Sequence, residues 1–347
     1  MLFRSNDGGS IVLTAGDGSG NGNVAQINDN GVAQNLVFAA GGSIQITAGG
    51  AGNNNVAQIR ANNGTSGVQT QSIGGAPNIT VTGGIAGGAA GSGNIASISN
   101  DRGSQNITAG SILLEAGLGG VENSATIRSP LQTIAATTVT LNAHASGSSG
   151  GARIGGGSTP LAAPTDLTLT TIGDITLNGG TTSGASLGAN ATPTAGQNVD
   201  VTIHAGGNVI LNGGNGAEAR IGSPASLVQG GHVSVTAAGS ISLQGSATNP
   251  AAIRSAGAVD LHADAAGGQI LQNATGLIAA SSLATTSHSG TQLVGANAVN
   301  TFSGGNSSGG GIALSNTAAV LALGGVSQSG SGDLVISNAG SMTLTNA

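Results

Sequence analysis

The chain contains seven cationic side chains, all of them arginine, and five of these share one setting. Each of the five lies within one residue of the aliphatic side chain that closes a repeated Ala-led segment. They are Arg60, Arg128, Arg153, Arg220 and Arg254. If the repeats stack, these guanidinium groups fall along one side of the molecule. One alternative is an outward ladder of arginines paired with acids such as Glu218 and Asp101, in which each exposed pair stabilises the fold by roughly a few tenths of a kcal/mol. The other is a sparse face that binds an anionic ligand such as an acidic glycan.

The histidines offer little further chemistry. His204 and His262 fall at matching outward positions two repeats apart, which is roughly 10 Å if the strands stack at the β spacing. A metal ion needs its nitrogen ligands within about 2 Å, so this pair does not form a metal site. Asp200 and His232 precede equivalent strands and are expected to stack as an exposed pair. We therefore predict no catalytic, metal-binding or cofactor-binding residues, no cofactor, and a chain that is not an enzyme.

A polysaccharide lyase or hydrolase is the remote enzymatic alternative. Such enzymes use paired carboxylates, or a base beside an arginine, in a groove, and they usually present aromatic platforms to the sugar. The thirteen acids of this chain are scattered, and it has no Trp or Tyr. An ice-binding solenoid is a further alternative. It requires a regular Thr array, whereas the outward positions here mix Gln, Asn, Ser, Asp and Thr.

The composition excludes an ordinary globular core. Of 347 residues, 65 are Gly, 1% are aromatic and 6% are charged, whereas about 25% are charged in a typical soluble domain. Disorder combines high charge with low hydrophobicity, and this chain has little charge and a mean hydropathy of +0.20. A net charge of −6 without a basic stripe argues against nucleic acid. The chain needs a fold that buries many small aliphatic groups.

A Gly-led block supplies the main periodic signal, first as GSIVLTAG and then as GSIQITAG and GSILLEAG. Its first apolar residue recurs about every 33 positions. The copies begin at Ile11, Ile44, Ile79, Ile112, Val139, Ile175, Val209 and Ile241. Repeats of this length indicate a solenoid, in which each unit buries its apolar face against its neighbours.

An Ala-led block follows each Gly-led block, and its closing aliphatic residues keep a similar step. They are Ile27, Ile59, Ile98, Ile127, Ile154, Leu187, Ile221 and Ile253. A weaker strand precedes the Gly-led block by about ten residues, as in Val201–Ile203 and Val233–Val235. Each repeat therefore holds three short strands separated by Gly, Asn, Ser and Thr turns.

These repeats predict an all-β chain folded as a right-handed parallel β-helix, a solenoid with three short strands per coil and roughly ten coils. Residues 1–266 are expected to form regular coils of about 32 residues. Residues 267–347 are expected to continue the helix with shorter, less regular coils, and both ends are expected to be truncated. The residue after the Gly-led strand is an amide in four successive copies, Asn142, Asn178, Asn212 and Gln244. Stacked amides hydrogen-bond from rung to rung, so we predict a structural amide ladder there.

The strands of the form G-[SDN]-[IV]-x-[LI], together with Gly311–Thr317 and Gly332–Asn338, resemble repeats of the filamentous haemagglutinin-like family of two-partner-secretion exoproteins. The resemblance implies a right-handed β-helix that an outer-membrane transporter exports to the surface of a Gram-negative cell. The family's secretion domain carries an Asn-Pro-Asn signature. Here the only Asn-Pro is Asn249-Pro250, so this chain is expected to be an internal segment.

The resemblance implies a non-catalytic rod of a large adhesin that is secreted or exposed at the outer membrane and contacts a glycan or protein receptor on a host cell or surface. The alternative is the stem of a contact-dependent toxin-delivery exoprotein. We find no signal peptide in this segment, because its start lacks an apolar core region. We expect no membrane span, because no apolar run approaches the required length, and no nucleic-acid partner.

Overall fold

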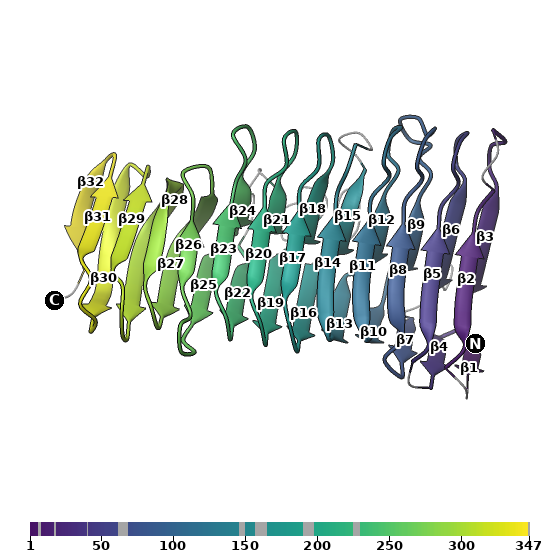
Figure 1. The fold of residues 1–347 in the computed structure, drawn as a ribbon, viewed down its shortest axis with the longest axis horizontal. Coiled ribbons are helices and arrows are strands. Elements are labelled where there is room, and N and C mark those ends of the chain that lie inside the picture. The colour runs from purple at the N-terminus through teal and green to yellow at the C-terminus, as the bar shows by residue number, and fades with distance from the viewer. Residues whose placement is uncertain are drawn as a thin grey trace.

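The computed structural model describes residues 1–5, 8–16, 19–39, 41–61, 69–145, 150–156, 165–189, 198–224 and 230–345. Within these ranges the regular structure consists of 32 β-strands and no helices. The strands wind into coils that stack along one axis, with the two chain termini at opposite ends of the rod (Figure 1). The predicted parallel β-helix is confirmed.

Strands at the same place in successive coils pair in parallel and build three faces. Face 1, the weaker strand of each repeat, contains β1 (Leu2–Ser5), β4 (Ala33–Phe38), β7 (Thr70–Gly74), β10 (Ser104–Thr108), β13 (Leu131–Ala136), β16 (Thr165–Thr171), β19 (Val199–Ala205), β22 (His232–Ala237) and β25 (Ala258–Ala263). Later coils continue face 1 with segments of the long strands β27 (Leu277–Ser287), β28 (Thr291–Asn306) and β30 (Val320–Gln328).

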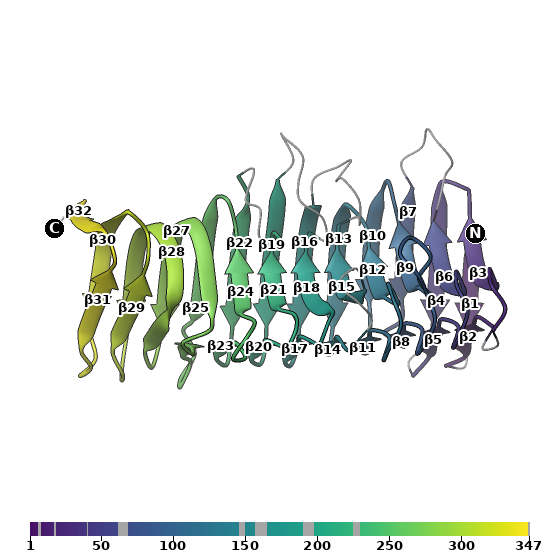
Figure 2. The ribbon, with the colours of Figure 1, turned by 90° about the horizontal axis from the view of Figure 1, so that it is seen from above.

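Face 2 is formed by the Gly-led strands and face 3 by the Ala-led strands. Face 2 contains β2 (Ser10–Thr14), β5 (Ser43–Thr47), β8 (Asn78–Thr82), β11 (Ser111–Glu115), β14 (Thr138–Asn142), β17 (Ile175–Asn178), β20 (Val209–Asn212), β23 (Ile241–Gln244), β26 (Ile270–Gln272), the start of β28, β29 (Ile312–Asn316) and β31 (Leu334–Asn338). Face 3 contains β3 (Val24–Asp29), β6 (Val56–Ala61), β9 (Ala96–Asn100), β12 (Ala125–Arg128), β15 (Gly151–Gly155), β18 (Gly184–Gly188), β21 (Ala219–Gly222) and β24 (Ala251–Arg254), and continues into β27 and β28. The last strand, β32 (Ser341–Leu344), pairs with β30. Seen from above, the strands of face 3 form a row along the rod (Figure 2).

The described residues form twelve coils, one for each strand or segment of face 2, where the sequence predicts about ten. The difference arises in the last part of the chain. There the face 2 register runs from Ile270 to Thr291, Ile312 and Leu334, a step of 21 or 22 residues. These coils are shorter because single long strands such as β27 and β28 pass from one face to the next, so the turns between faces are reduced.

The core is a set of aliphatic columns that follow this register. On face 2 the column runs from Ile11 through the predicted members to Ile241 and Ile270. The residues in it are buried, as are those of the matching column on face 3 beyond Ile27. One inward side chain per strand position, repeated about every 4.8 Å, fills the interior mainly with aliphatic groups. Phe38 and Phe302 are buried among them. The predicted alignment of both blocks is confirmed.

One core column on face 1 is polar in its first part. Gln34, Gln71, Gln105 and Gln132 are stacked in register and buried. Gln71, Gln105 and Gln132 each donate a side-chain N–H to the side-chain oxygen of the Gln one coil earlier, over 2.7 Å from Gln71 to Gln34 and 2.6 Å from Gln132 to Gln105. Beyond Gln132 the same position is aliphatic, beginning with Leu167. The amides can be buried because the column is continuous.

This column yields a test of stability. Replacing Gln105 with Leu removes the acceptor of the Gln132 amide and the donor to Gln71 Oε1. Each buried group left without a partner costs about 1–3 kcal/mol, so the variant should unfold at lower urea concentration by circular dichroism. Replacing all four glutamines with Leu should recover most of the loss, because the column then resembles that of the following coils. A single Gln105→Leu variant as stable as the parent would contradict a cooperative amide column.

Candidate functional site

The five arginines of the Ala-led block all lie on face 3, in two neighbouring columns. Arg153 and Arg220 precede the closing aliphatic residue. Arg60, Arg128 and Arg254 follow it. We call the surface defined by these five residues the arginine face. The sequence brings them to one side, and the structure divides them into two acid-bridged groups with Arg153 between them.

The first group is centred on Asp101. Its two carboxylate oxygens accept from Arg60 Nη2 at 3.0 Å and from Arg128 Nε at 3.1 Å. The side chains of Arg60 and Asp101 are 34% and 32% exposed. Since solvent screens such pairs, this bridge contributes little to stability.

The second group is centred on Glu218, which precedes β21. Its carboxylate accepts from Arg220 Nη1 at 2.9 Å and from Arg254 Nη1. Arg220 also donates from Nη2 to the carbonyl oxygen of Ala189 at 2.7 Å. The side chains of Arg220 and Arg254 are only 10% and 8% exposed. Glu218 is therefore the counter-ion of two nearly buried cations.

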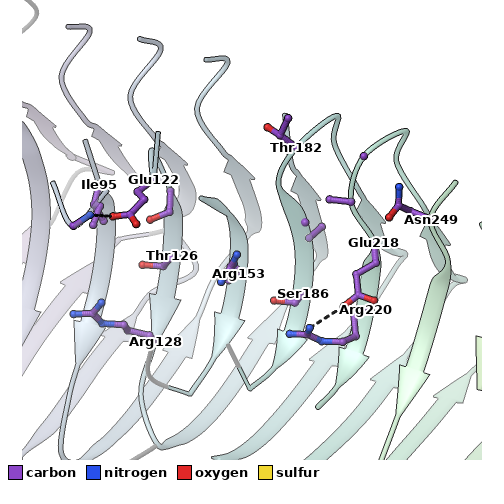
Figure 3. Close-up of a pocket in the computed structure, with 16 residues that line it drawn as sticks. Ile95, Glu122, Thr126, Arg128, Arg153, Thr182, Ser186, Glu218, Arg220 and Asn249 are labelled. Carbon is purple, nitrogen blue, oxygen red and sulfur yellow. Dashed lines mark hydrogen bonds and ion pairs between the residues drawn. The ribbon is translucent and has the colours of Figure 1, made fainter. Parts of the chain in front are cut away.

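Arg153 lies between these groups in a hollow of about 740 Å³ on face 3. Figure 3 shows Arg153 between Arg128 and Ser186, with the guanidinium of Arg220 extending toward Ser186. Burial, and to a smaller extent the positive charge of Arg220, lower the pKa of Arg153 to about 10, while Glu218 opposes the shift. Burial also lowers the pKa of Arg220, while Glu218 acts to raise it. Both side chains stay cationic at neutral pH, in an environment that does not fully compensate them.

A strip of glycines runs beside the column that holds Arg153 and Arg220. The column that holds Arg128 and Arg254 is occupied by Gly155, Gly188 and Gly222 in the three coils between them. Their φ angles are 142°, 118° and 96°, and a Cβ on them would lie 1.9, 2.7 and 2.0 Å from the carbonyl oxygen of the next coil. Glycine is required there by conformation and by close approach. As a result, the strip beside Arg153 and Arg220 carries no side chains.

Two buried polar atoms that line the hollow have no hydrogen-bond partner among the described residues. They are Thr126 Oγ1 and Arg220 Nε. Thr126 occupies the same column as Arg153, one coil earlier. Buried polar atoms are normally paired, so the wall of the hollow contains two donors that the described residues leave unsatisfied.

The predicted amide ladder joins three of its four members. Asn178 donates to Asn142 Oδ1 at 2.7 Å, and Asn212 donates to Asn178 Oδ1 at 2.8 Å. Gln244 is in register with Asn212 but donates to Ser242 Oγ instead. At the other end, Asn142 donates to Glu115 Oε1 at 2.6 Å. The three asparagines therefore link neighbouring coils, which is a structural role, while Gln244 bonds within its own strand.

Two polar columns were not predicted from the sequence. They are the buried glutamines of face 1 and a set of asparagines at the turn before face 3. The asparagines are Asn23, Asn55, Asn94 and Asn123. The side-chain oxygen of each of the last three accepts from the backbone N–H of the preceding member at 2.8–3.0 Å. A signal was present, since each Asn stands two residues before the Ala of its block and each Gln two residues before an aliphatic residue.

Three of the five histidines, His204, His232 and His262, lie on strands of face 1. His204 and His262 are in register with Thr236 between them, so they are two rungs apart as predicted. The backbone N–H of His232 donates to Asp200 Oδ1 at 2.8 Å, and its ring Nε2 lies 2.7 Å from Asp260 Oδ2. The predicted pairing of Asp200 with His232 is thus made through the backbone, and the ring pairs with an acid in the next coil.

No protein-family model, curated protein or solved structure matches this chain. The resemblance to filamentous haemagglutinin-like repeats therefore stays a prediction that rests on the repeat residues themselves. In the part of the chain that the structure describes, no helix is long and apolar enough to cross a membrane.

The two acid bridges yield a matched pair of substitutions. Glu218→Gln leaves two nearly buried guanidinium groups without their counter-ion and should destabilise the fold by about 2–4 kcal/mol. Asp101→Asn removes the same charge from a bridge that is one-third exposed and should cost less than about 1 kcal/mol. Urea denaturation of both variants measures the difference. Equal losses of stability would contradict the structural distinction between the two groups.

Proposed function

We propose that this chain is a non-catalytic rod of a large bacterial surface-exposed or secreted adhesin, which mediates contact with a cell or surface. The observation that supports this most directly is the continuity of hydrogen-bonded polar columns along the rod axis. Glutamines inside face 1, asparagines before face 3 and asparagines after face 2 each link several successive coils. Such links resist sliding and separation of coils, as a load-carrying stalk requires.

The distribution of charge supports a role in contact. Five of the seven arginines lie on the strands of face 3, whereas Asp166, Asp200 and Asp260 lie on strands of face 1 and Glu115 lies on face 2. The chain is acidic overall, with a net charge of −6, yet most of its arginines lie on one side, where Asp101 and Glu218 pair with four of them. Weak contacts repeated along such a side add up through multivalency when many rods share one surface.

The family resemblance extends this proposal to the cellular setting. The chain would be exported by an outer-membrane transporter and displayed outside a Gram-negative cell, where it would meet a glycan or protein receptor. The repeat residues alone support this part of the proposal.

The proposal predicts a stiff rod that adheres when it is presented in many copies. Twelve coils at the β spacing give a length of about 55 Å, which small-angle scattering on the purified chain would measure, alongside a β-type circular dichroism spectrum. Beads coated with the chain should bind cultured epithelial cells more strongly than albumin-coated beads. A globular or expanded scattering profile would contradict the rod, and equal bead binding would contradict the contact function.

A further inference from the structure

We propose that the hollow around Arg153, Ser186 and Arg220 on the arginine face binds a carboxylate of a short acidic oligosaccharide. This inference rests on the proposed contact function and gives it a discrete site. The ligand does not need to pair with all five arginines of the face, because Asp101 already bridges Arg60 and Arg128.

The charge balance of the hollow favours an anion. Arg153 and Arg220 lie one coil to either side of Ser186, and Arg254 lies one coil beyond Arg220. Glu218 is shared between Arg220 and Arg254. The other acid of the hollow, Glu122, lies toward the opposite end of the hollow from Glu218 (Figure 3). Its carboxylate accepts a hydrogen bond from the backbone N–H of Gly91 at 2.6 Å. The mutual repulsion of Arg153 and Arg220, which helps to lower the pKa of Arg153, would be relieved by a negative group between them.

The geometry also favours an anion at this point. Arg153, Ser186 and Arg220 are successive members of one column, so the two cations stand about 10 Å apart along the rod. A side chain as small as Ser186, flanked by Gly184 and Gly188, leaves the space between them open. Arginine presents a planar set of donors that matches a carboxylate.

Unpaired donors point to a ligand with acceptor oxygens. The side chain of Arg220 is 10% exposed, and its Nε has no partner among the described residues. Thr126 Oγ1, which lines the same hollow, is buried and also unpaired. Leaving such groups unmatched costs stability, so the wall of the hollow retains a capacity to donate hydrogen bonds that the described residues do not use.

The size and lining of the hollow favour a saccharide over a bare ion. A volume of about 740 Å³ lies in the range of small-molecule sites, roughly 300–1,000 Å³. Its walls include Thr182, Ser186 and Asn249 besides the charged groups. Hydroxyl and amide side chains suit a ligand with many hydroxyl groups, recognised here by hydrogen bonds because the chain has no Trp or Tyr.

Calorimetry with trigalacturonate and its fully methyl-esterified form tests the site on the whole chain. We expect trigalacturonate to bind, and the uncharged ester to bind about tenfold or more weakly, because charge-assisted hydrogen bonds are lost. Arg153→Gln should weaken trigalacturonate binding by a similar factor. Arg60→Gln, which removes the same charge from the same face outside the hollow, should stay within about twofold of the parent.

A second variant guards against a folding defect. Ser186→Trp fills the hollow without changing charge and should also abolish binding while the β-type circular dichroism spectrum is retained. The inference is overturned if the ester binds as well as the acid, if Arg60→Gln weakens binding as much as Arg153→Gln, or if inorganic sulfate competes with the same affinity as trigalacturonate. Absence of trigalacturonate binding overturns it as well. If trigalacturonate does not bind but coated beads still adhere to cells, the proposed contact function stands without this site. If the beads also fail to adhere, both the site and the contact function are overturned.

Discussion

Parallel backbone hydrogen bonds between successive coils are the interaction on which the rest of the molecule depends. Each inner coil must satisfy its N–H and C=O groups on both sides, because its strands have neighbours above and below. This fixes the register so strictly that Ile11 is followed at the same place by Ile44 and, seven coils later, by Ile241. A shift of one residue would turn every aliphatic side chain outward. The core is therefore specified position by position along columns.

The same constraint explains how amides can lie inside the rod. A buried amide is tolerated when the residues above and below it supply a donor and an acceptor, which stacking does automatically for a run of identical side chains. At the start of the column Gln34 donates to the carbonyl oxygen of Arg60. At the other end Gln132 Oε1 has no partner among the described residues, at the boundary where Leu167 takes over. The column thus incurs its desolvation cost mainly at one end.

Sequence periodicity was sufficient to predict the fold and most of the register. The aliphatic columns of faces 2 and 3 could be aligned because spacing and residue type agree in every copy. The acids that bridge the arginines, Asp101 and Glu218, could also be named, because they lie near the repeated block. What could not be derived was how deeply each cation is buried. Arg60 and Arg254 have the same place in their repeats, and only the packing of neighbouring coils makes the first about four times as exposed as the second.

The hollow on the arginine face shows why a repetitive fold can still hold a local site. Inward positions are constrained by both neighbours, so variation is confined to outward positions and turns. Between Arg128 and Arg254 the outward column becomes glycine for three coils, because those residues adopt φ angles and contacts that exclude a Cβ. The loss of three side chains from one column makes room beside Arg153 and Arg220 in the next column. The side chains of Arg153 and Arg220 therefore lie beside a strip of bare backbone, where a continued column of arginines would have carried side chains.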